Sequence, residues 1–437
     1  MSEYRKVKIG DFLTEREGRY KPDDEKISNY KRLEKIDFSG VIHISDKASK
    51  TDMIIVHPGD LVISGINVAK GAVAVYQGNE PVCATIHYSS YTFDDKQVDL
   101  EYFKYFVKSD AFVSALQKQV KGGIKTEIKP KHLLPLEITI PDLETQKEIV
   151  KKVSINLKNV ETLTKEIESQ KAYAKQFRQN ILQDAIEGKL TAEWRKIHPV
   201  IKGNPDFDAE ALFEEIQKEK KSDKKQKELA PIGDDEKPFE IPEGWKWVRL
   251  GKICEGFMYG TSDKSVASGK CPVLRMGNIQ NGIIDWEKLV YTNNDEEIQK
   301  YSIEKYDLLF NRTNSREMVG KTSIYDSDRK AIYAGYLVKF KAILSQPYYV
   351  DYVLNTPMHR DWCNQVKVDA LGQSNINAEK LRNFVFPLPA LLEQKEIVEI
   401  VSKLLMKEEL LGQQISQREE YANQLMQSIL KDSFEER

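Results

Sequence analysis

The feature that most constrains this chain is a long internal repeat. Residues 141–150 (PDLETQKEIV) match residues 389–398 (PALLEQKEIV) at an offset of 248, since 389 minus 141 is 248, and the match continues without a gap. About twenty of some forty-seven aligned positions are identical, too many for chance similarity between two generic helices. The sequence therefore predicts two copies of one structural unit, with a period far longer than that of a solenoid repeat.

Each repeated segment predicts one long helix, because its apolar residues fall on the a and d positions of a single heptad frame. A helix of about forty residues spans about 60 Å at its usual rise. An ordinary surface helix is the alternative, but a helix this long outruns the face of one small domain. The predicted interface with the other helix or with partners consists of Val150, Val153, Leu157, Val160 and Ile167 in the first copy and Val398, Val401, Leu405 and Ile415 in the second.

The segments that precede the two helices have a mixed α/β pattern, with short β-rich runs bounded by Gly, Pro, Asn and Asp. The predicted fold class is two copies of a mixed α+β globular domain, separated by two long antiparallel helices in a pseudo-twofold internal repeat. A charged run at 218–227 predicts a solvated linker between the halves, with a helical section near 209–220. The predicted organisation is a first domain at 1–140, a helix at 141–189, the linker at 190–244, a second domain at 245–388 and a helix at 389–437.

Composition narrows the class of protein. The chain has 437 residues, 40% hydrophobic and 31% charged, which is typical of a globular protein with more than one core. Its net charge of −2 counts mildly against nucleic-acid binding, so any basic surface must be local or belong to a partner. The start of the chain lacks a signal-peptide core and no apolar run reaches membrane-span length, which predicts a cytoplasmic location.

Motifs for catalysis are missing from the sequence. There is no Pro-Pro-aromatic loop that could hold a flipped adenine and no Gly-x-x-x-x-Gly-Lys phosphate loop. The cysteines are far apart and the histidines are scattered, so neither a zinc site nor a nucleophile constellation is visible. The sequence predicts a chain that is not an enzyme and that binds no cofactor or metal. The four cysteines are Cys83, Cys254, Cys271 and Cys363.

Several strings resemble one known family, the specificity subunits of type I restriction–modification systems. They are residues 387–394 (PLPALLEQ), 181–191 (ILQDAIEGKLT) and 241–251 (IPEGWKWVRLG), set in the order domain, helix, domain, helix. The resemblance covers essentially the whole chain. Asp142 and Thr145 depart from the usual proline-rich Glu-Gln form, while residues 146–150 keep it.

The resemblance implies a function for each part. Each domain would read one half of an interrupted site in double-stranded DNA, and the two helices would pack antiparallel as a spacer. The same helices would dock two methyltransferase subunits, which use S-adenosylmethionine to methylate adenine at N6. Two restriction subunits that use ATP and Mg would complete the complex in systems that cleave DNA.

Candidate DNA-reading residues come from polar loops of both domains. Arg suits guanine O6 and N7, whereas Asn and Gln suit adenine N6 and N7. The same residue types also form ordinary turns, so a solvated loop is the alternative for each of them. The candidates are Asn67, Lys70, Lys121, Lys125 and Thr126 in the first domain and Arg275, Asn278, Asn311, Arg312, Asn314, Arg316, Lys321, Gln373, Ser374 and Asn375 in the second.

Two other functions remain open from the sequence. A two-headed coiled-coil scaffold that binds other proteins would have no DNA affinity even with its partners present. The recognition half of a split type II-like restriction–modification enzyme would read DNA in the same way but act with a different catalytic partner.

Overall fold

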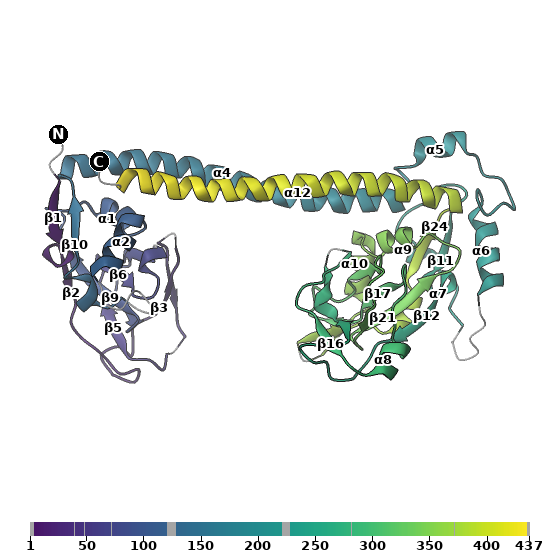
Figure 1. Cartoon of the computed structure of the whole chain (residues 1–437), viewed down its shortest axis with the longest axis horizontal. Helices are drawn as coiled ribbons and strands as arrows, with labels where there is room; N and C mark the ends of the chain where they lie inside the picture. Colours follow the sequence, from purple (N-terminus) through teal and green to yellow (C-terminus); the bar gives the residue numbers. More distant parts are fainter. Residues whose placement is uncertain are drawn as a thin grey trace. The chain divides into compact units, whose positions relative to one another are not determined.

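The computed structural model describes residues 4–38, 40–47, 49–70, 72–119, 128–220, 228–280, 282–370 and 372–434. The chain forms two compact units. Unit 1 consists of Met1–Gln170 and Ile415–Arg437, and unit 2 consists of Lys171–Gln414. Both long helices contribute to both units, because each crosses the boundary between them (Figure 1).

Unit 1 contains two four-stranded sheets, in the orders β2-β9-β6-β7 and β4-β3-β8-β5, and the antiparallel pair β1–β10. Its strands are β1 (Arg5–Lys8), β2 (Leu13–Glu15), β3 (Arg32–Ile36), β4 (Ile42–Ser45), β5 (Met53–Val56), β6 (Leu61–Ser64), β7 (Val73–Val75), β8 (Val82–Thr85), β9 (Tyr88–Phe93) and β10 (Glu137–Ile140). Its helices are α1 (Leu100–Phe106), α2 (Asp110–Gln119), α3 (Pro130–Leu133) and the first part of α4 (Leu143–Ile186).

Unit 2 contains a four-stranded sheet in the order β12-β21-β17-β19, two three-stranded sheets in the orders β16-β13-β20 and β18-β23-β22, and the pairs β11–β24 and β14–β15. The strands are β11 (Lys246–Arg249), β12 (Cys254–Tyr259), β13 (Cys271–Leu274), β14 (Ile279–Gln280), β15 (Ile283–Ile284), β16 (Val290–Thr292), β17 (Leu308–Asn311), β18 (Thr313–Asn314), β19 (Thr322–Ile324), β20 (Ile332–Tyr333), β21 (Leu337–Ala342), β22 (Val368–Ala370), β23 (Gln373–Asn375) and β24 (Val385–Leu388). The helices are α5 (Ala192–Ile197), α6 (Ala209–Glu219), α7 (Leu250–Ile253), α8 (Asp295–Lys300), α9 (Pro347–Val353), α10 (Pro357–Val366), α11 (Ala378–Arg382) and the first part of α12 (Leu391–Phe434).

The globular parts of the two units share one fold. The sheet β2-β9-β6-β7 has the same order and pairing as β12-β21-β17-β19: Leu61 lies opposite Tyr91 in one, and Leu308 lies opposite Phe340 in the other. The pairs β1–β10 and β11–β24 likewise join the first strand of a domain to its last. The predicted fold class, two copies of an α+β domain with two long helices, is confirmed.

The two long helices run antiparallel within each unit. In unit 2 the Arg178 guanidinium donates to the Glu408 carboxylate at 3.0 Å. In unit 1 Arg418 donates to the Gln170 side-chain oxygen at 3.3 Å. One of the two core positions of the heptad frame is buried along α4 and recurs every seven residues. The buried residues are Val153, Val160, Ile167, Ala174 and Ile181.

The start of each long helix is part of the core of its domain. Val153 of α4 and Leu430 and Phe434 of α12 pack with the unit 1 core, against which Val150 and Leu157 also lie. In unit 2 Val401 belongs to the core, with Val398 and Leu405 packed against it, while Ile415 is 3% exposed on the unit 1 part of α12. Burial of this much apolar surface fixes each domain to its own part of the helix pair.

The structure differs from the predicted linker at 190–244. The helical section is present as α6, but Ala209, Leu212 and Ile216 on its inner face are fully buried in the unit 2 core. The apolar residues of α6 are spaced at i, i+3 and i+7, which suffices for one buried stripe. The α6 part of this stretch therefore packs on the unit 2 core, whereas α5 has no buried residue.

Candidate nucleic-acid interface

The predicted reading loops of the second domain meet in one small sheet. Asn314 in β18 lies opposite Ser374 in β23, and Thr313 lies opposite Asn375, although some sixty residues separate the two strands in sequence. A third strand, β22, pairs with β23 and is exposed along its whole length. We call this three-stranded sheet, with Tyr259 and Arg312 beside it, the reading surface of unit 2.

Arg312 is held in place at the edge of this surface. Its guanidinium lies 4.6 Å from the centroid of the Tyr259 ring, and its Nη2 donates to the Asn375 Oδ1 at 3.4 Å. A guanidinium stacked on an aromatic ring loses less freedom on binding, because its planar fork is already oriented. Sequence reasoning found Arg312 but missed Tyr259, which is 41% exposed and comes from a distant strand.

Other candidates on the reading surface differ in exposure. Arg316 and Gln373 are exposed, whereas Asn314 and Asn375 are half-buried. The Arg316 Nε lies 3.5 Å from the Asp369 carboxylate on β22. The exposed pair can present donors and acceptors to a ligand. The Asn375 amide already accepts from Arg312 and donates to the Thr313 hydroxyl at 2.7 Å.

Three further candidates use their polar side chains for hydrogen bonds within the protein. Asn278 is 4% exposed: its Oδ1 accepts from the Arg275 N–H at 2.9 Å, and its Nδ2 donates to two backbone carbonyls. Asn311 is fully buried and donates to the Met276 carbonyl at 3.2 Å. Ser374 is 1% exposed and donates to Asp369. Such residues shape turns because their short polar side chains bind nearby backbone, so we leave them out of the proposed contacts.

The remaining two candidates of unit 2 bind residues outside the reading surface. Arg275 is exposed and donates to the Lys288 carbonyl at 3.3 Å. The Lys321 ammonium donates to the Gln280 Oε1 at 2.7 Å. Burial, and then the neighbouring Arg360 charge, hold the pKa of Lys321 below its usual value. A lysine at this position suits a phosphate, although part of the donor capacity of Lys321 is already in use.

Unit 1 repeats the backbone arrangement with different residues. The Ile128 N–H donates to the Gly65 carbonyl at 2.8 Å, as the Ile376 N–H donates to the Arg312 carbonyl at 2.9 Å. Asn67 forms the turn that leads into Lys70, whose ammonium lies 5.6 Å from the Phe38 ring centroid. The candidates Lys121, Lys125 and Thr126 lie outside the described residues.

Unit 1 also has a basic cleft that the sequence analysis missed. The cleft has a volume of about 530 Å³, and Arg16, Arg19, Lys129 and Lys131 are among its lining residues, with Glu15 and Glu17 as its acids. Arg16 is fixed by the buried Asp60, which accepts from its Nε at 3.0 Å and its Nη2 at 2.9 Å. The string of Arg and Glu at 15–19 was visible in the sequence, but only the fold brings it to the two lysines.

Exposed apolar side chains on the helix pair recur at the same repeat positions. Leu163 and Leu411 are 37% and 43% exposed, and Tyr173 and Tyr421 are 69% and 57% exposed. Phe177 and its counterpart Leu425, 248 residues later, are 45% and 48% exposed. We call these the repeated apolar positions. Each unit therefore has large apolar side chains exposed at equivalent places of the repeat.

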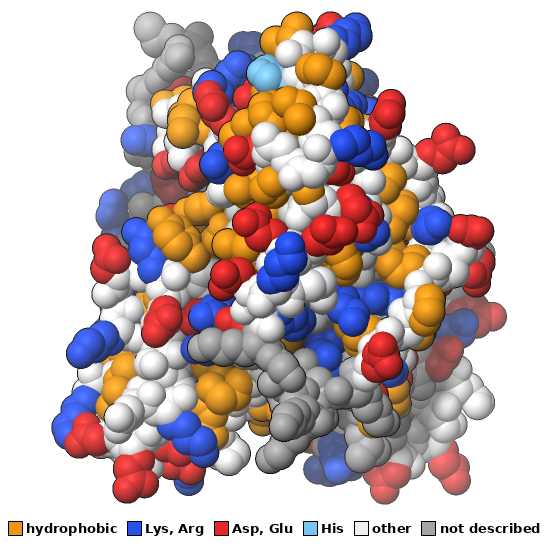
Figure 2. All heavy atoms as spheres, turned by 90° about the vertical axis from the view of Figure 1, so that its right-hand side faces the viewer, with side chains coloured by type: hydrophobic (Ala, Val, Ile, Leu, Met, Phe, Trp, Pro, Cys, Tyr) orange, Lys and Arg blue, Asp and Glu red, His pale blue; other side chains and the backbone are white. Residues whose placement is uncertain are grey.

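The surface charges and the arrangement of His, Cys, Asp and Glu side chains limit the kinds of ligand that the described residues can bind. On the face in Figure 2, Lys and Arg side chains are interspersed with Asp and Glu and form no single basic patch. Within the described residues, no three His, Cys, Asp or Glu side chains gather closely enough to hold a metal ion. The four cysteines are buried and free. In the same part of the chain, no helix has both the length and the apolar character to span a membrane.

Comparison with known proteins matches both copies of the fold. The model of the type I restriction modification DNA specificity domain family matches residues 1–171 and 242–419. The EcoKI specificity subunit of Escherichia coli K12 is 24% identical over 388 residues, covering 87% of this chain and 75% of that protein. The StySPI specificity subunit of Salmonella potsdam is 24% identical over 390 residues, covering 87% and 74%.

A solved structure supports the fold. A chain from a type I restriction–modification system superposes with a TM-score of 0.63 at 16% identity and covers 99% of this chain and 97% of its own length. At 16% identity, this similarity shows a shared fold and nothing about function. The family model, by contrast, matches most of the chain in two separate stretches. The chain therefore belongs to the type I restriction–modification specificity subunits.

Proposed function

We propose that this chain reads a two-part DNA site, with one half recognised by the domain of unit 1 and the other by the domain of unit 2. The observation that carries this proposal is the pair of domains with one sheet order and different side chains at matching loop positions. Arg312 in unit 2 stands where unit 1 has Gly65, as the shared hydrogen bonds from Ile376 and Ile128 indicate. A common scaffold with different reading residues suits two different half-sites.

The proposed contacts divide into reading and positioning groups. Arg312, Asn314, Arg316, Gln373 and Asn375 have the donors and acceptors that recognise base edges in the major groove. Lysines, which carry point charges, fit phosphates and position the protein without reading sequence. These are Lys70, Lys129, Lys131 and Lys321, with Lys121 and Lys125 kept as predictions. Since the chain has a net charge of −2, partner subunits would supply much of the remaining phosphate neutralisation.

The helix pair is proposed to set the spacing between half-sites and to dock two methyltransferase subunits. The repeated apolar positions support two copies of one partner, because each unit has exposed apolar side chains on its own part of the pair. The methyltransferase would supply S-adenosylmethionine chemistry at adenine N6. Restriction subunits, where present, would supply ATP- and Mg-dependent cleavage. The chain itself would act in the cytoplasm and bind no cofactor.

Exchange of one domain tests the proposal directly. When residues 1–140 are replaced by the corresponding domain of another specificity subunit, one half of the methylated site should change and the other half should stay. The reason is that each domain has its own core and its own loops. The measurement is a map of methylated adenines in cells that express the chimera with the methyltransferase. A change in both halves, or in neither, would contradict independent reading.

A further inference from the structure

A single buried carboxylate in unit 2 joins three parts of the chain. Glu393, in the first turn of α12, is 3% exposed. Its carboxylate accepts from the Thr191 hydroxyl at 2.7 Å, from the Arg195 Nη1 at 2.5 Å and from the Trp245 indole Nε1 at 2.7 Å. We call these four residues the carboxylate joint. A buried carboxylate with three donors is fully satisfied and strongly directional.

The partners of Glu393 come from different parts of unit 2. Arg195 also donates to the Gly188 carbonyl at 2.6 Å, which ties it to the chain two residues after the end of α4. Gly188 has a φ of +72°, and a Cβ there would lie 2.6 Å from the Pro242 ring and 2.9 Å from the Arg195 guanidinium. Trp245 lies directly before β11, the first strand of the domain. The joint therefore connects the end of α4, the domain and the start of α12.

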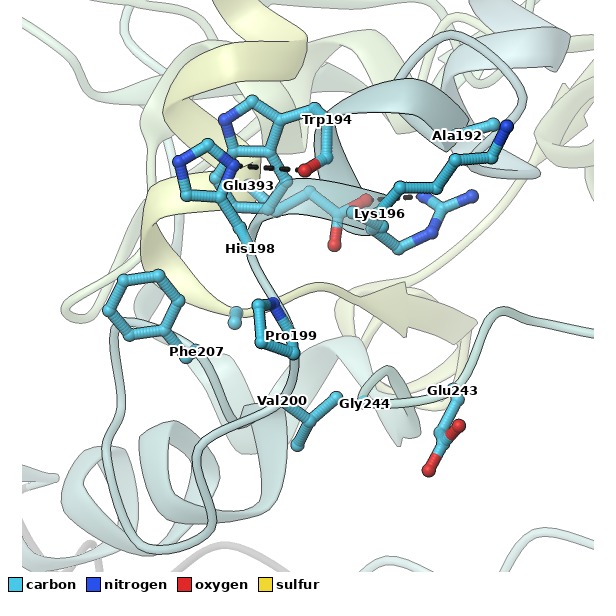
Figure 3. Close-up of a pocket in the computed structure, with 12 residues that line it drawn as sticks. Ala192, Trp194, Lys196, His198, Pro199, Val200, Phe207, Glu243, Gly244 and Glu393 are labelled. Atoms are coloured by element: carbon cyan, nitrogen blue, oxygen red, sulfur yellow. Dashed lines mark hydrogen bonds and ion pairs between the residues drawn. The ribbon is translucent and has the colours of Figure 1, made fainter.

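The segment that leads away from Thr191 also covers the start of α12. The N–H groups of Leu391 and Leu392 donate to the carbonyls of Pro205 and Asp206 at 3.1 and 3.2 Å. Between α5 and α12 lies a pocket of about 510 Å³. Figure 3 shows the rings of Trp194, His198 and Phe207 along one side of this pocket; the Trp194 and His198 centroids are 4.1 Å apart. The segment thus holds the start of the helix by backbone as well as side-chain contacts.

The matching position in unit 1 lacks such a joint. Thr145 stands 248 residues before Glu393, and its N–H and hydroxyl donate to Asp142, within the same turn, at 2.9 and 3.0 Å. These hydrogen bonds lower the pKa of Asp142. The next residue is the same in both units: Gln146 accepts from the Asp99 N–H at 2.8 Å, and Gln394 accepts from the Gln346 N–H at 2.9 Å. Both domains share the glutamine contact, but only unit 2 adds the buried carboxylate.

We infer that Glu393 is a positioning residue that fixes the angle of the second domain on its part of the helix pair. Apolar packing alone lets a domain rock by small amounts, whereas three directional hydrogen bonds to one buried carboxylate allow one arrangement. This inference rests on the proposed function, because the angle matters only if the domain reads a half-site at a set distance. The carboxylate joint then limits which spacings between half-sites the chain accepts.

The test separates positioning from stability. Removal of one member of a buried ion pair leaves an unpaired charge and destabilises the fold, whereas apolar replacement of both members is often neutral. The informative variant is therefore the double substitution Arg195→Met with Glu393→Met, and Trp245→Phe is a second, milder variant. Thr145→Ala, at the matching position of unit 1, is the control. Each chain is assembled with the methyltransferase and assayed for methylation of duplexes whose half-sites are moved apart or together by one or two base pairs.

The unaltered chain and Thr145→Ala should methylate one spacing strongly. The double variant is compared only if its unfolding temperature is close to that of the unaltered chain. It should methylate duplexes with neighbouring spacings about tenfold better than the unaltered chain does, because a domain that can change its angle still reaches a displaced half-site. Trp245→Phe should also increase methylation of duplexes with neighbouring spacings. A folded double variant with the unaltered spacing profile would overturn the inference, and if that variant does not fold, an unaltered profile of Trp245→Phe would do so. If the unaltered chain methylates no two-part site at all, the proposed function fails instead.

Discussion

A chain with Tyr173→Asp and Phe177→Asp is expected to bind one methyltransferase subunit, whereas the unaltered chain is expected to bind two. Both side chains are repeated apolar positions of unit 2, 69% and 45% exposed. Burial of one large apolar side chain contributes about 1.5–3 kcal/mol. Loss of two, with two carboxylates placed against an apolar partner surface, weakens binding by more than about a hundredfold.

The second docking site should survive this change, because its side chains belong to unit 1. Tyr421 and Leu425 are their counterparts there, and the Gln170–Arg418 contact places Leu163 at the level of Leu425 along the helix pair. The variant Tyr421→Asp with Leu425→Asp should therefore also retain one partner, and the combination of all four substitutions should retain none. Native mass spectrometry of the reconstituted complex measures the number of bound subunits.

A control on the same helix distinguishes docking from helix damage. Ala172 is exposed but lies on another face of α4 from Tyr173 and Phe177, since successive residues are about 100° apart. Ala172→Asp introduces the same residue type as the test variant, with the same low helix propensity of Asp, but on another face of the helix. This control should leave two partners bound. Two bound subunits in the Tyr173 and Phe177 variant would remove these positions from the docking sites, and loss of both subunits would contradict independent sites.

The long helices were the most predictable part of the fold. Their heptad pattern is local, and α4 and α12 begin and end within three residues of the predicted 141–189 and 389–437. Gly412 does not interrupt α12, because packing and its long helical flanks outweigh the cost of about 1 kcal/mol for one glycine. The sheet orders were not predictable, since strand pairing depends on contacts between residues far apart in sequence, such as β18 with β23.

The sequence predicted the region where the candidate reading residues gather better than it predicted which of their side chains are accessible. The strings at 311–316 and 372–375 do come together, but the residue types that suit base contacts also suit turns. Asn278 and Ser374 satisfy their polar atoms inside the protein, which no local pattern reveals. Glu393 is a similar case: it stands in the string PLPALLEQ, and nothing in the sequence links it to Arg195, 198 residues earlier.

Substitution of Arg312 by alanine is expected to weaken recognition of the second half-site only. The Arg312 guanidinium has a fixed orientation on Tyr259, and its Nη1 and Nη2 donate to the Gly335 carbonyl and the Asn375 Oδ1, each at 3.4 Å. Each of these nitrogens carries a second N–H, and that pair suits a bidentate contact with guanine. Loss of such a contact costs about 1–3 kcal/mol, or about 5- to 150-fold in affinity. Arg312→Lys should recover little of it, because an ammonium keeps the charge but not the planar fork.

Arg329 is a matched control for this substitution. Its guanidinium also lies over an aromatic ring of unit 2, 4.7 Å from the Trp286 centroid, but it is outside the reading surface. Arg329→Ala should therefore leave both half-sites unchanged. The measurement is binding of the assembled complex to duplexes in which each base pair of one half-site is varied in turn, at a fixed salt concentration. If Arg312→Ala weakens binding equally for every sequence, the side chain contacts phosphate; if it changes nothing, Arg312 is not part of the interface. Discrimination lost at one base pair of the second half-site, with the first half-site intact, is the result that a base-reading arginine requires.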